Sequence, residues 1–211
     1  MPSAIAVMDA TTPPLPHFRF HPDPIATGAI KESDRECQVC KKQTGYICKT
    51  PLYLESGYYC PWCIASGKAA DIHTSNKPEE PDYPTVEYEV WVYDDDDDEL
   101  RLYRDAEKSV VSEEDLIELG CRTPGYHSWQ NPRWLVHCGS PCAFIDYVRW
   151  KKIEERLDRF IDLEGDATRT IGATIDRLTW LLCDDKGDIG VTGYLFQCIH
   201  CGGYRLHLDR D

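Results

Sequence analysis

The chain of 211 residues is long enough for one large domain or two small ones, and it carries a formal net charge of −14 and eleven cysteines. A strongly acidic protein repels nucleic acid, and no stretch approaches the roughly 18 apolar residues that a membrane span needs. An odd number of cysteines is unlike a disulfide framework, and the first ten residues lack the basic and apolar regions of a signal peptide. We therefore expect a reduced, cytoplasmic protein whose cysteines bind metal.

The net charge comes from one segment of the chain. Residues 79–118 contain 17 acidic residues and 3 basic ones, whereas the rest of the chain contains 20 of each. Thiolate-bound zinc would make the folded protein more acidic still, because four thiolates carry more charge than one Zn²⁺. Such a field attracts basic proteins.

The N-terminal residues 1–16 include three prolines in their second half and little that needs burial, so we expect them to be flexible. Residues 18–28 follow with two X-Pro steps, which favour an extended backbone. We interpret this stretch as an ordered strap across the domain. The alternative is that His21 and Asp23 belong to a ligand site.

Two Cys-x-x-Cys pairs follow the strap. Cys37 and Cys40 form the first pair, Cys60 and Cys63 form the second, and nineteen residues separate the pairs. Two residues between cysteines direct both sulfur atoms into one tight turn, and two such turns complete a tetrahedron around Zn²⁺. Cys-Pro-Trp-Cys also resembles a redox dithiol, but the partner pair at zinc spacing favours a structural metal site.

Short strands are expected at residues 45–50 and 52–54, between these pairs, and a helix is expected over 64–70. Residues 86–93 alternate between apolar and polar positions like a half-buried strand, and 100–103 can form the returning strand. The six acids of 94–99 lie between them. Such a run is by default a solvated loop, with partner binding as the alternative.

Ser112, with Asp115 three residues later, resembles a capped helix start, and Gly120 is expected to end that helix. Two tryptophans, Trp129 and Trp134, then lie five residues apart. Core packing is the favoured interpretation for such a pair, and a recognition surface is the alternative.

Beyond this point the pattern predicts one helix over 143–163, stopped by Gly165, and a second over 168–182. Strands are expected at 193–197 and 204–208, on either side of a cysteine turn. A strand, a cysteine turn and a second strand in succession are typical of a zinc ribbon, in which such a unit supplies half of the metal ligands.

That cysteine turn belongs to a second predicted zinc site. Cys138 and Cys142 have three residues between them, whereas Cys198 and Cys201 have two. These four thiols complete a second ligand set, with His137 as the reserve ligand because it adjoins Cys138. We therefore expect two structural Zn²⁺ ions per chain.

The predicted fold class is α+β: small zinc-stabilised domains with knuckle- or ribbon-like hairpins, an acidic β-hairpin and two to three helices. Four regions are expected: a flexible terminus at 1–16, a zinc-knuckle region at 17–76, an acidic linker, hairpin and short helix at 77–120, and a C-terminal region with the second site at 121–211. One compact domain overall is the alternative.

The sequence resembles the CbrC, or colicin tolerance, family across nearly its whole length. Five segments match, namely residues 20–28, 60–67, 123–130, 137–144 and 194–202. Two of them contain the Cys-x-x-Cys turns that begin at Cys60 and Cys198. The acidic hairpin of 85–105 looks less typical of the family. The resemblance implies a poorly characterised zinc-binding bacterial protein with a role in tolerance of a nuclease colicin.

These observations favour a non-enzymatic cytoplasmic protein that binds a protein partner, such as a basic toxin or nuclease domain. One alternative is a zinc-ribbon protein that binds nucleic acid or has a regulatory role, and the acidic charge opposes nucleic-acid binding. A second is a metal-dependent enzyme, with His21 and Asp23, or His137 and His200, as an acid–base set. Four-thiolate sites leave no position for an activated water, and no phosphate loop or His-Glu metalloprotease signature is present.

Overall fold

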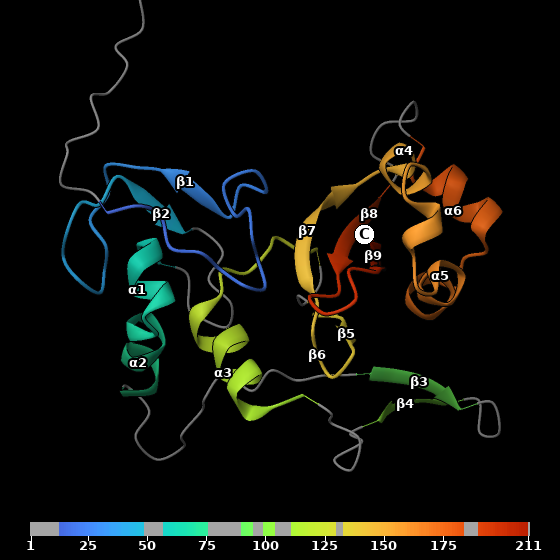
Figure 1. Ribbon diagram of the computed structural model, residues 1–211, viewed down its shortest axis with the longest axis horizontal. Coiled ribbons are helices and arrows are strands. Elements are labelled where there is room, and N and C mark those ends of the chain that lie inside the picture. The colour runs from blue at the N-terminus through green and yellow to red at the C-terminus, as the bar shows by residue number, and fades with distance from the viewer. Residues whose placement is uncertain are drawn as a thin grey trace, which may run out of the picture.

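The computed structural model of the protein describes seven stretches of the chain, namely residues 13–48, 57–75, 90–94, 99–103, 111–129, 133–183 and 190–210. These stretches combine small antiparallel sheets with six α-helices (Figure 1). The mixed helix-and-sheet class is therefore confirmed, with more helices than the two or three expected. Residues 1–12 of the predicted flexible terminus, the expected strand at 52–54 and residues 95–98 of the acidic run lie outside the described stretches.

The N-terminal half of the fold is a two-stranded sheet with three short helices. Strands β1 and β2 pair antiparallel, with Ile30 opposite Cys48. Helix α1 has proline at its first position, where the missing N–H costs nothing, and the Ser112 hydroxyl accepts the N–H of Asp115 to cap α3 at 3.1 Å. The elements are β1 (Ile30–Glu32), β2 (Tyr46–Cys48), α1 (Pro61–Ala65), α2 (Lys68–Ser75) and α3 (Glu113–Arg122).

The predicted acidic hairpin is present as strands β3 (Val90–Asp94) and β4 (Glu99–Tyr103). They pair antiparallel along their full length, with Val90 opposite Tyr103 and Asp94 opposite Glu99. The predicted strands at 86–93 and 100–103 therefore pair as expected where the structure describes them, whereas residues 86–89 lie outside the described stretches.

The C-terminal half is built on the three-stranded antiparallel sheet β7-β8-β9, with a small β5–β6 hairpin beside it. Helices α4, α5 and α6 gather on one side of this sheet (Figure 1). The elements are β5 (Val136–His137), β6 (Ser140–Pro141), β7 (Ala143–Val148), α4 (Trp150–Glu154), the 3-10 turn η1 (Leu157–Arg159), α5 (Leu163–Ile171), α6 (Ile175–Leu181), β8 (Val191–Gln197) and β9 (Tyr204–Arg210).

Alternate residues of β8 belong to different hydrophobic cores, as the period of two requires. Leu195 packs with the apolar residues of α5 and α6, including Ala167 and Leu178. Tyr194 and Phe196 belong to a cluster rich in aromatic rings on the other face. The sheet therefore separates an aliphatic core from an aromatic one.

The predicted strap joins two parts of the fold. Phe18 is buried with Ile30 and Ile64 in the N-terminal half, whereas Phe20 is buried in the aromatic core. The carbonyl of Phe20 also accepts the backbone N–H of Phe144 in β7 at 2.8 Å. Two buried rings, with one residue between them, thus tie the N-terminal half to the C-terminal sheet.

The predicted helix over 143–163 is wrong over most of its length: it begins as a strand, and only Trp150–Glu154 and the short 3-10 turn Leu157–Arg159 are helical before α5 begins at Leu163. Phe144 and Val148 are four residues apart, which suits one face of a helix, but residues 143–148 form strand β7. A register shift between Phe144 and Asp146 marks a β-bulge, which explains why the alternation of a strand is not visible in the sequence. Pairing with β8 decides the outcome for a segment rich in β-branched and aromatic residues.

The predicted helix over 168–182 is two helices. Gly172 adopts a left-handed conformation (φ 62°) that ends α5, and the Thr174 hydroxyl caps α6 by accepting the N–H of Arg177. Gly165, expected as a stop, lies in the first turn of α5, where its N–H donates to the Asp162 carboxylate at 3.0 Å. Gly120 likewise lies inside α3.

Candidate metal centres

The first cluster of candidate ligands lies between the β1–β2 sheet and α1. The Sγ atoms of Cys37, Cys40, Cys60 and Cys63 all lie within 4.8 Å of one another. All but Cys40 are almost fully buried. The structure thus brings together all four residues of the first predicted site.

Local backbone turns create this arrangement. The N–H of Lys41 donates to the carbonyl of Cys37 at 2.9 Å, and Lys41 takes a left-handed conformation (φ 58°) that closes the first knuckle. Cys60 stands at the start of α1, so its carbonyl accepts the N–H of Cys63 at 3.0 Å. The backbone N–H of Cys60 also donates to the Cys37 sulfur at 3.2 Å. Donors aimed at a sulfur atom favour its thiolate form, which is the form that binds metal.

The pKa of Cys37 reflects this environment. Burial opposes ionisation, but the backbone N–H groups of Cys40, Cys60 and Val39 outweigh it and lower the pKa of Cys37 to about 7. The same balance acts at Cys198 in the second cluster. There burial is outweighed by the N–H of Cys201, the His137 ring and a further backbone N–H, and the pKa falls to about 6. Each cluster therefore contains one thiol that ionises near neutral pH.

The second cluster is formed by three thiols and one imidazole. His137, Cys138, Cys198 and Cys201 place their ligand atoms within 4.8 Å of one another. The Nδ1 atom of His137 lies 3.2 Å from the Cys138 sulfur and 3.5 Å from the Cys201 sulfur. Cys138 and Cys201 are exposed, in contrast to the thiols of the first cluster.

Cys142, the fourth thiol predicted for this site, lies outside the cluster, and His137 takes its place. Cys138 and Gly139 form a two-residue turn between β5 and β6 with positive φ at both positions (51° and 76°), as a type I′ hairpin requires. Cys142 comes after the returning strand and is completely buried in the aromatic core. Burial raises its pKa to about 12, so this thiol stays protonated.

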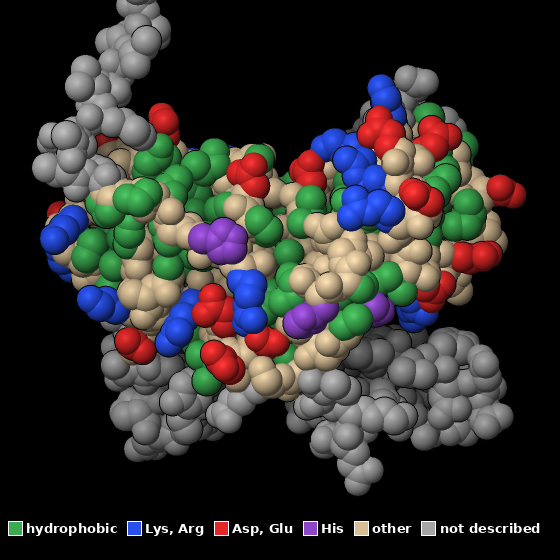
Figure 2. Space-filling model, in the orientation of Figure 1, with side chains coloured by type: hydrophobic (Ala, Val, Ile, Leu, Met, Phe, Trp, Pro, Cys, Tyr) green, Lys and Arg blue, Asp and Glu red, His purple; other side chains and the backbone are tan. Residues whose placement is uncertain are grey.

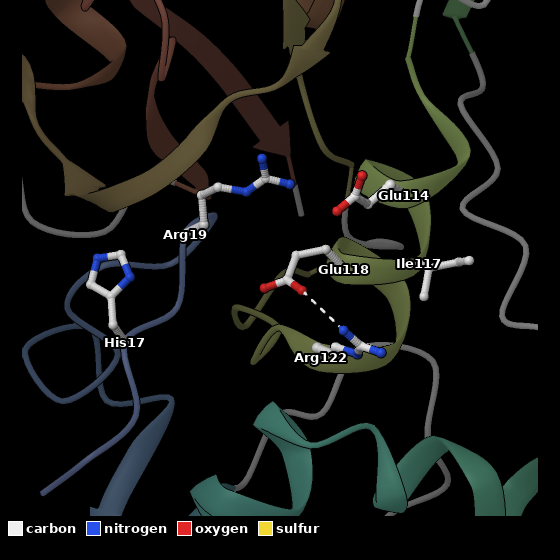
Figure 3. Close-up of a pocket in the computed structure, with 6 residues that line it drawn as sticks. All are labelled: His17, Arg19, Glu114, Ile117, Glu118 and Arg122. Carbon is white, nitrogen blue, oxygen red and sulfur yellow. Dashed lines mark ion pairs between the residues drawn. The ribbon is translucent and has the colours of Figure 1, made fainter.

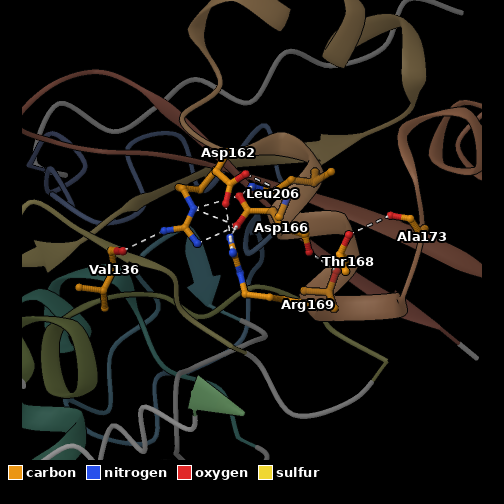
Figure 4. Close-up of polar contacts among 10 residues, drawn as sticks. Val136, Asp162, Asp166, Thr168, Arg169, Ala173 and Leu206 are labelled. Carbon is orange, nitrogen blue, oxygen red and sulfur yellow. Dashed lines mark hydrogen bonds and ion pairs between the residues drawn. The ribbon is translucent and has the colours of Figure 1, made fainter. Parts of the chain in front are cut away.

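A buried ion pair holds the backbone next to His137. The Nη1 of Arg205 donates to the carbonyl of Val136 at 3.1 Å, and its Nε donates to both carboxylate oxygens of Asp166 at 2.9 and 3.0 Å (Figure 4). Asp166 also accepts from Arg169, at 2.7 Å, and is only 2% exposed. The network links α5, β9 and β5, and thereby fixes the strand that carries a candidate ligand.

Both donor sets fit zinc. Thiolate sulfur and imidazole nitrogen are the donors that Zn²⁺ prefers, and each cluster offers the four ligands of a tetrahedral structural site. Oxygen-preferring ions such as Mg²⁺ and Ca²⁺ would find no carboxylate in either group. All eleven cysteines lie in the described stretches, and no disulfide joins any two of them there.

Comparison with known proteins places this arrangement in a family. The model of an uncharacterised protein family, UPF0167, matches residues 15–210, a span that contains every candidate ligand. The chain belongs to the UPF0167 family. It is 35% identical over 205 residues to the UPF0167 protein PA1536 of Pseudomonas aeruginosa, covering 94% of this chain and 98% of that protein. It is 31% identical over 208 residues to the UPF0167 protein Mb2317 of Mycobacterium bovis, covering 96% and 98%. No solved structure matches the chain.

His21 and Asp23, the alternative ligand pair, make hydrogen bonds within the strap and to the segment that follows α3 in this UPF0167 protein. One ring nitrogen of His21 bonds the carbonyl of Pro124 at 2.9 Å and the other bonds the hydroxyl of Thr27 at 2.7 Å. Burial lowers the pKa of His21 to about 4, so the ring is neutral. Asp23 accepts the N–H of Ala26 at 3.0 Å in the turn that follows. Both residues fix the strap, as the favoured interpretation expects.

None of the candidate metal ligands lines the groove that runs between the strap and α3, where acidic and basic side chains lie side by side on the surface (Figure 2). The groove has a volume of about 700 Å³ and is lined by His17 and Arg19 on one side and by side chains of α3 on the other (Figure 3). Arg122 pairs with Glu118 across one helical turn at 3.9 Å. Arg19 pairs with Asp115, which in turn accepts the hydroxyl of Ser140 at 2.7 Å. These contacts join the strap to α3 and to the β6 strand beside the second cluster.

A helix that crosses a membrane must be both long and apolar. None of the helices that the structure describes is both long enough and apolar enough to cross a membrane.

Proposed function

We propose that this protein is a non-enzymatic zinc protein, in which two structural Zn²⁺ ions hold the knuckles in place and leave the surface to bind a protein partner. The two four-ligand clusters carry the proposal. Four protein ligands complete a tetrahedral shell and leave no position for an activated water, which is the arrangement of structural rather than catalytic zinc. A cytoplasmic location, where thiols stay reduced, belongs to the same proposal.

Metal content tests the first half of this proposal. Protein purified under reducing conditions should contain two zinc ions per chain by elemental analysis, and native mass spectrometry should show the doubly loaded species. At most a trace of zinc would overturn the proposal. One zinc per chain would remove the second, more exposed centre and leave the first.

Partner binding is supported by charge. The segment 79–118 accounts for the whole net charge of −14, and complementary fields accelerate the association of oppositely charged proteins. The resemblance to the colicin tolerance family suggests the basic domain of a nuclease toxin as the partner. The same charge disfavours the competing role in nucleic-acid binding.

A kinetic experiment separates these roles. Replacing residues 94–98 with Asn and Ser should slow association with a basic nuclease domain and flatten its salt dependence, because a long-range field acts mainly on the association rate. Zinc content and melting temperature should not change. Unchanged association at low salt would reduce the run to a solubilising insertion, and tighter binding to DNA than to the basic domain would favour the nucleic-acid role.

A further inference from the structure

A small pocket opens at the edge of the C-terminal sheet and belongs to neither metal centre. It has a volume of about 260 Å³ and lies where the end of β7, the start of β8 and the segment that follows α3 meet. Its principal side chains are His127, Trp129, Tyr147, Arg149, Thr192 and Tyr194. The Thr-Pro-Gly-Tyr-His-Ser-Trp stretch that begins at residue 123 thus forms one wall of a pocket.

Successive residues of this wall are individually anchored. The N–H of His127 donates to the Tyr147 hydroxyl at 2.8 Å, and the hydroxyl of Ser128 donates to the carboxylate of Asp209. The indole N–H of Trp129 donates to the Thr192 hydroxyl at 3.2 Å. A wall held at every residue loses little conformational entropy when a ligand arrives, so the pocket is preorganised.

The carboxylate of Asp209, which anchors Ser128, is itself held in place by a further hydrogen bond. Asp209 is 2% exposed and also bonds the His207 ring at 2.9 Å. Although burial opposes ionisation, the bonds from His207 and Ser128 lower the pKa of Asp209 to about 2. An ionised, buried carboxylate accepts strong hydrogen bonds, and this one fixes the wall to β9.

Trp129 presents a large apolar surface that the fold leaves uncovered. Its side chain is 58% exposed even though its N–H is bonded, and the His127 ring approaches it in a T-shaped geometry at 6.0 Å. Trp134, five residues later, is buried in the aromatic core. The two tryptophans therefore differ: the second is core, and the first is a rigid ring facing solvent beside a pocket.

The polar groups of the pocket define the chemistry of a ligand. Arg149 brings a guanidinium, whose Nη1 donates to the carbonyl of Val191 at 3.5 Å. A guanidinium has five N–H donors, so it can serve several acceptors and match a carboxylate in a bidentate geometry. No acidic side chain lines the pocket among the residues that the structure describes. Burial raises the pKa of Tyr147, so its hydroxyl is neutral and can also bond an anion.

The size of the pocket limits the ligand that it can hold. The volume lies just below the usual range of about 300–1,000 Å³ for pockets that hold drug-sized ligands. One six-membered ring with a short acidic substituent fits this volume. We propose that this pocket binds a small aromatic carboxylate, with its ring against Trp129 and its carboxylate paired with Arg149.

Calorimetric titration of the full-length, zinc-loaded protein with benzoate and phenylacetate tests the proposal, with benzamide as the uncharged control of equal shape. At least one carboxylate should bind with a Kd on the order of 0.1–1 mM, as expected for a fragment of this size. Benzamide should bind about tenfold more weakly, because it lacks the charge-assisted pair. No heat of binding from either acid up to about 10 mM, or equal affinity for benzamide, would overturn the proposal.

Two variants locate the site. Trp129→Ala should weaken benzoate binding by about tenfold through the loss of stacking surface, and Trp129→Phe should restore most of it. Trp180→Ala is the matched control, because Trp180 on α6 is similarly exposed (55%) and does not line the pocket. Arg149→Met should abolish the preference for benzoate over benzamide. An equal loss from Trp129→Ala and Trp180→Ala, or a preference that survives Arg149→Met, would count against the assignment.

Discussion

The two candidate metal centres are built in opposite ways. The first is buried, but it is surrounded by a two-stranded sheet and a five-residue helix, and three of its thiols form their own small core. The second has two exposed thiols, but it stands on a three-stranded sheet that has a hydrophobic core on each face. A metal at the first centre would add to a small hydrophobic cluster, whereas a metal at the second would join turns that the scaffold already positions.

The two centres should differ most in their effect on folding when one ligand is removed from each. Cys60→Ser should give insoluble or partly unfolded protein, because structural zinc contributes roughly 10–16 kcal/mol of apparent binding free energy in small zinc-finger peptides, part of it available for folding. Cys201→Ser should yield soluble protein with one zinc fewer. Soluble yield, far-UV circular dichroism and zinc content measure the difference.

Controls for this prediction come from thiols outside both clusters. Cys121 and Cys183 are half-buried and belong to neither ligand set, so Cys121→Ser and Cys183→Ser should be mild. If these two variants were as damaging as Cys60→Ser, the division into ligands and free thiols would be wrong. If Cys201→Ser were as damaging as Cys60→Ser, the contrast between the centres would disappear.

The identity of the fourth ligand at the second centre gives the next largest effect. His137→Ala should reduce the zinc content to about one ion per chain, because three ligands leave the coordination shell incomplete. Cys142→Ala should keep both ions and lose only packing in the aromatic core, about 1 kcal/mol. Native mass spectrometry distinguishes the two variants, and the reverse pattern would restore Cys142 as the ligand.

The two centres should also release zinc at different rates, because their thiols differ in exposure. When excess chelator is added with a chromogenic zinc indicator, we expect two phases, with the faster one from the second centre, where Cys138 and Cys201 face solvent. The buried thiols of the first centre can be reached only after local opening. The Cys201→Ser variant should lack the fast phase. A single phase in the unmodified protein, or a fast phase that persists in the variant, would contradict this order.

The first centre could be predicted from the sequence because its geometry is local. Each Cys-x-x-Cys turn brings its own two thiols together, so only the pairing of the turns depends on the fold. The second centre could be predicted only in part, because a hairpin turn at Cys138 decides which neighbour faces the metal. The adjoining Gly139 was the available signal: a Cys-Gly turn with positive φ at both positions directs His137, rather than Cys142, towards the cluster.

Secondary structure could likewise be predicted where it depends on residues that are near one another in the sequence. The Ser112 cap and the strands flanking the turn at Cys198 depend on nearby residues, and the structure contains both. Strand β7 depends on pairing with β8, some fifty residues away, and its apolar spacing resembled a helix. The break at Gly172 was visible in principle, because Thr174 two residues later is a strong helix-capping residue.

The smallest effect concerns how the scaffold supports the second centre. Arg205→Lys keeps a positive charge near Asp166, but an ammonium group lacks the planar fork that bonds both this carboxylate and the carbonyl of Val136. Residues that orient metal ligands from behind change metal affinity by about 10- to 100-fold when they are removed, so this conservative change should speed zinc loss from the second centre by about tenfold. Release from the first centre should be unchanged. Arg177→Lys, on the exposed side of α6, is the control and should alter neither phase. If Arg205→Lys accelerated both phases equally, the ion pair would stabilise the whole fold, and if it accelerated neither, the turns themselves would hold the ligands.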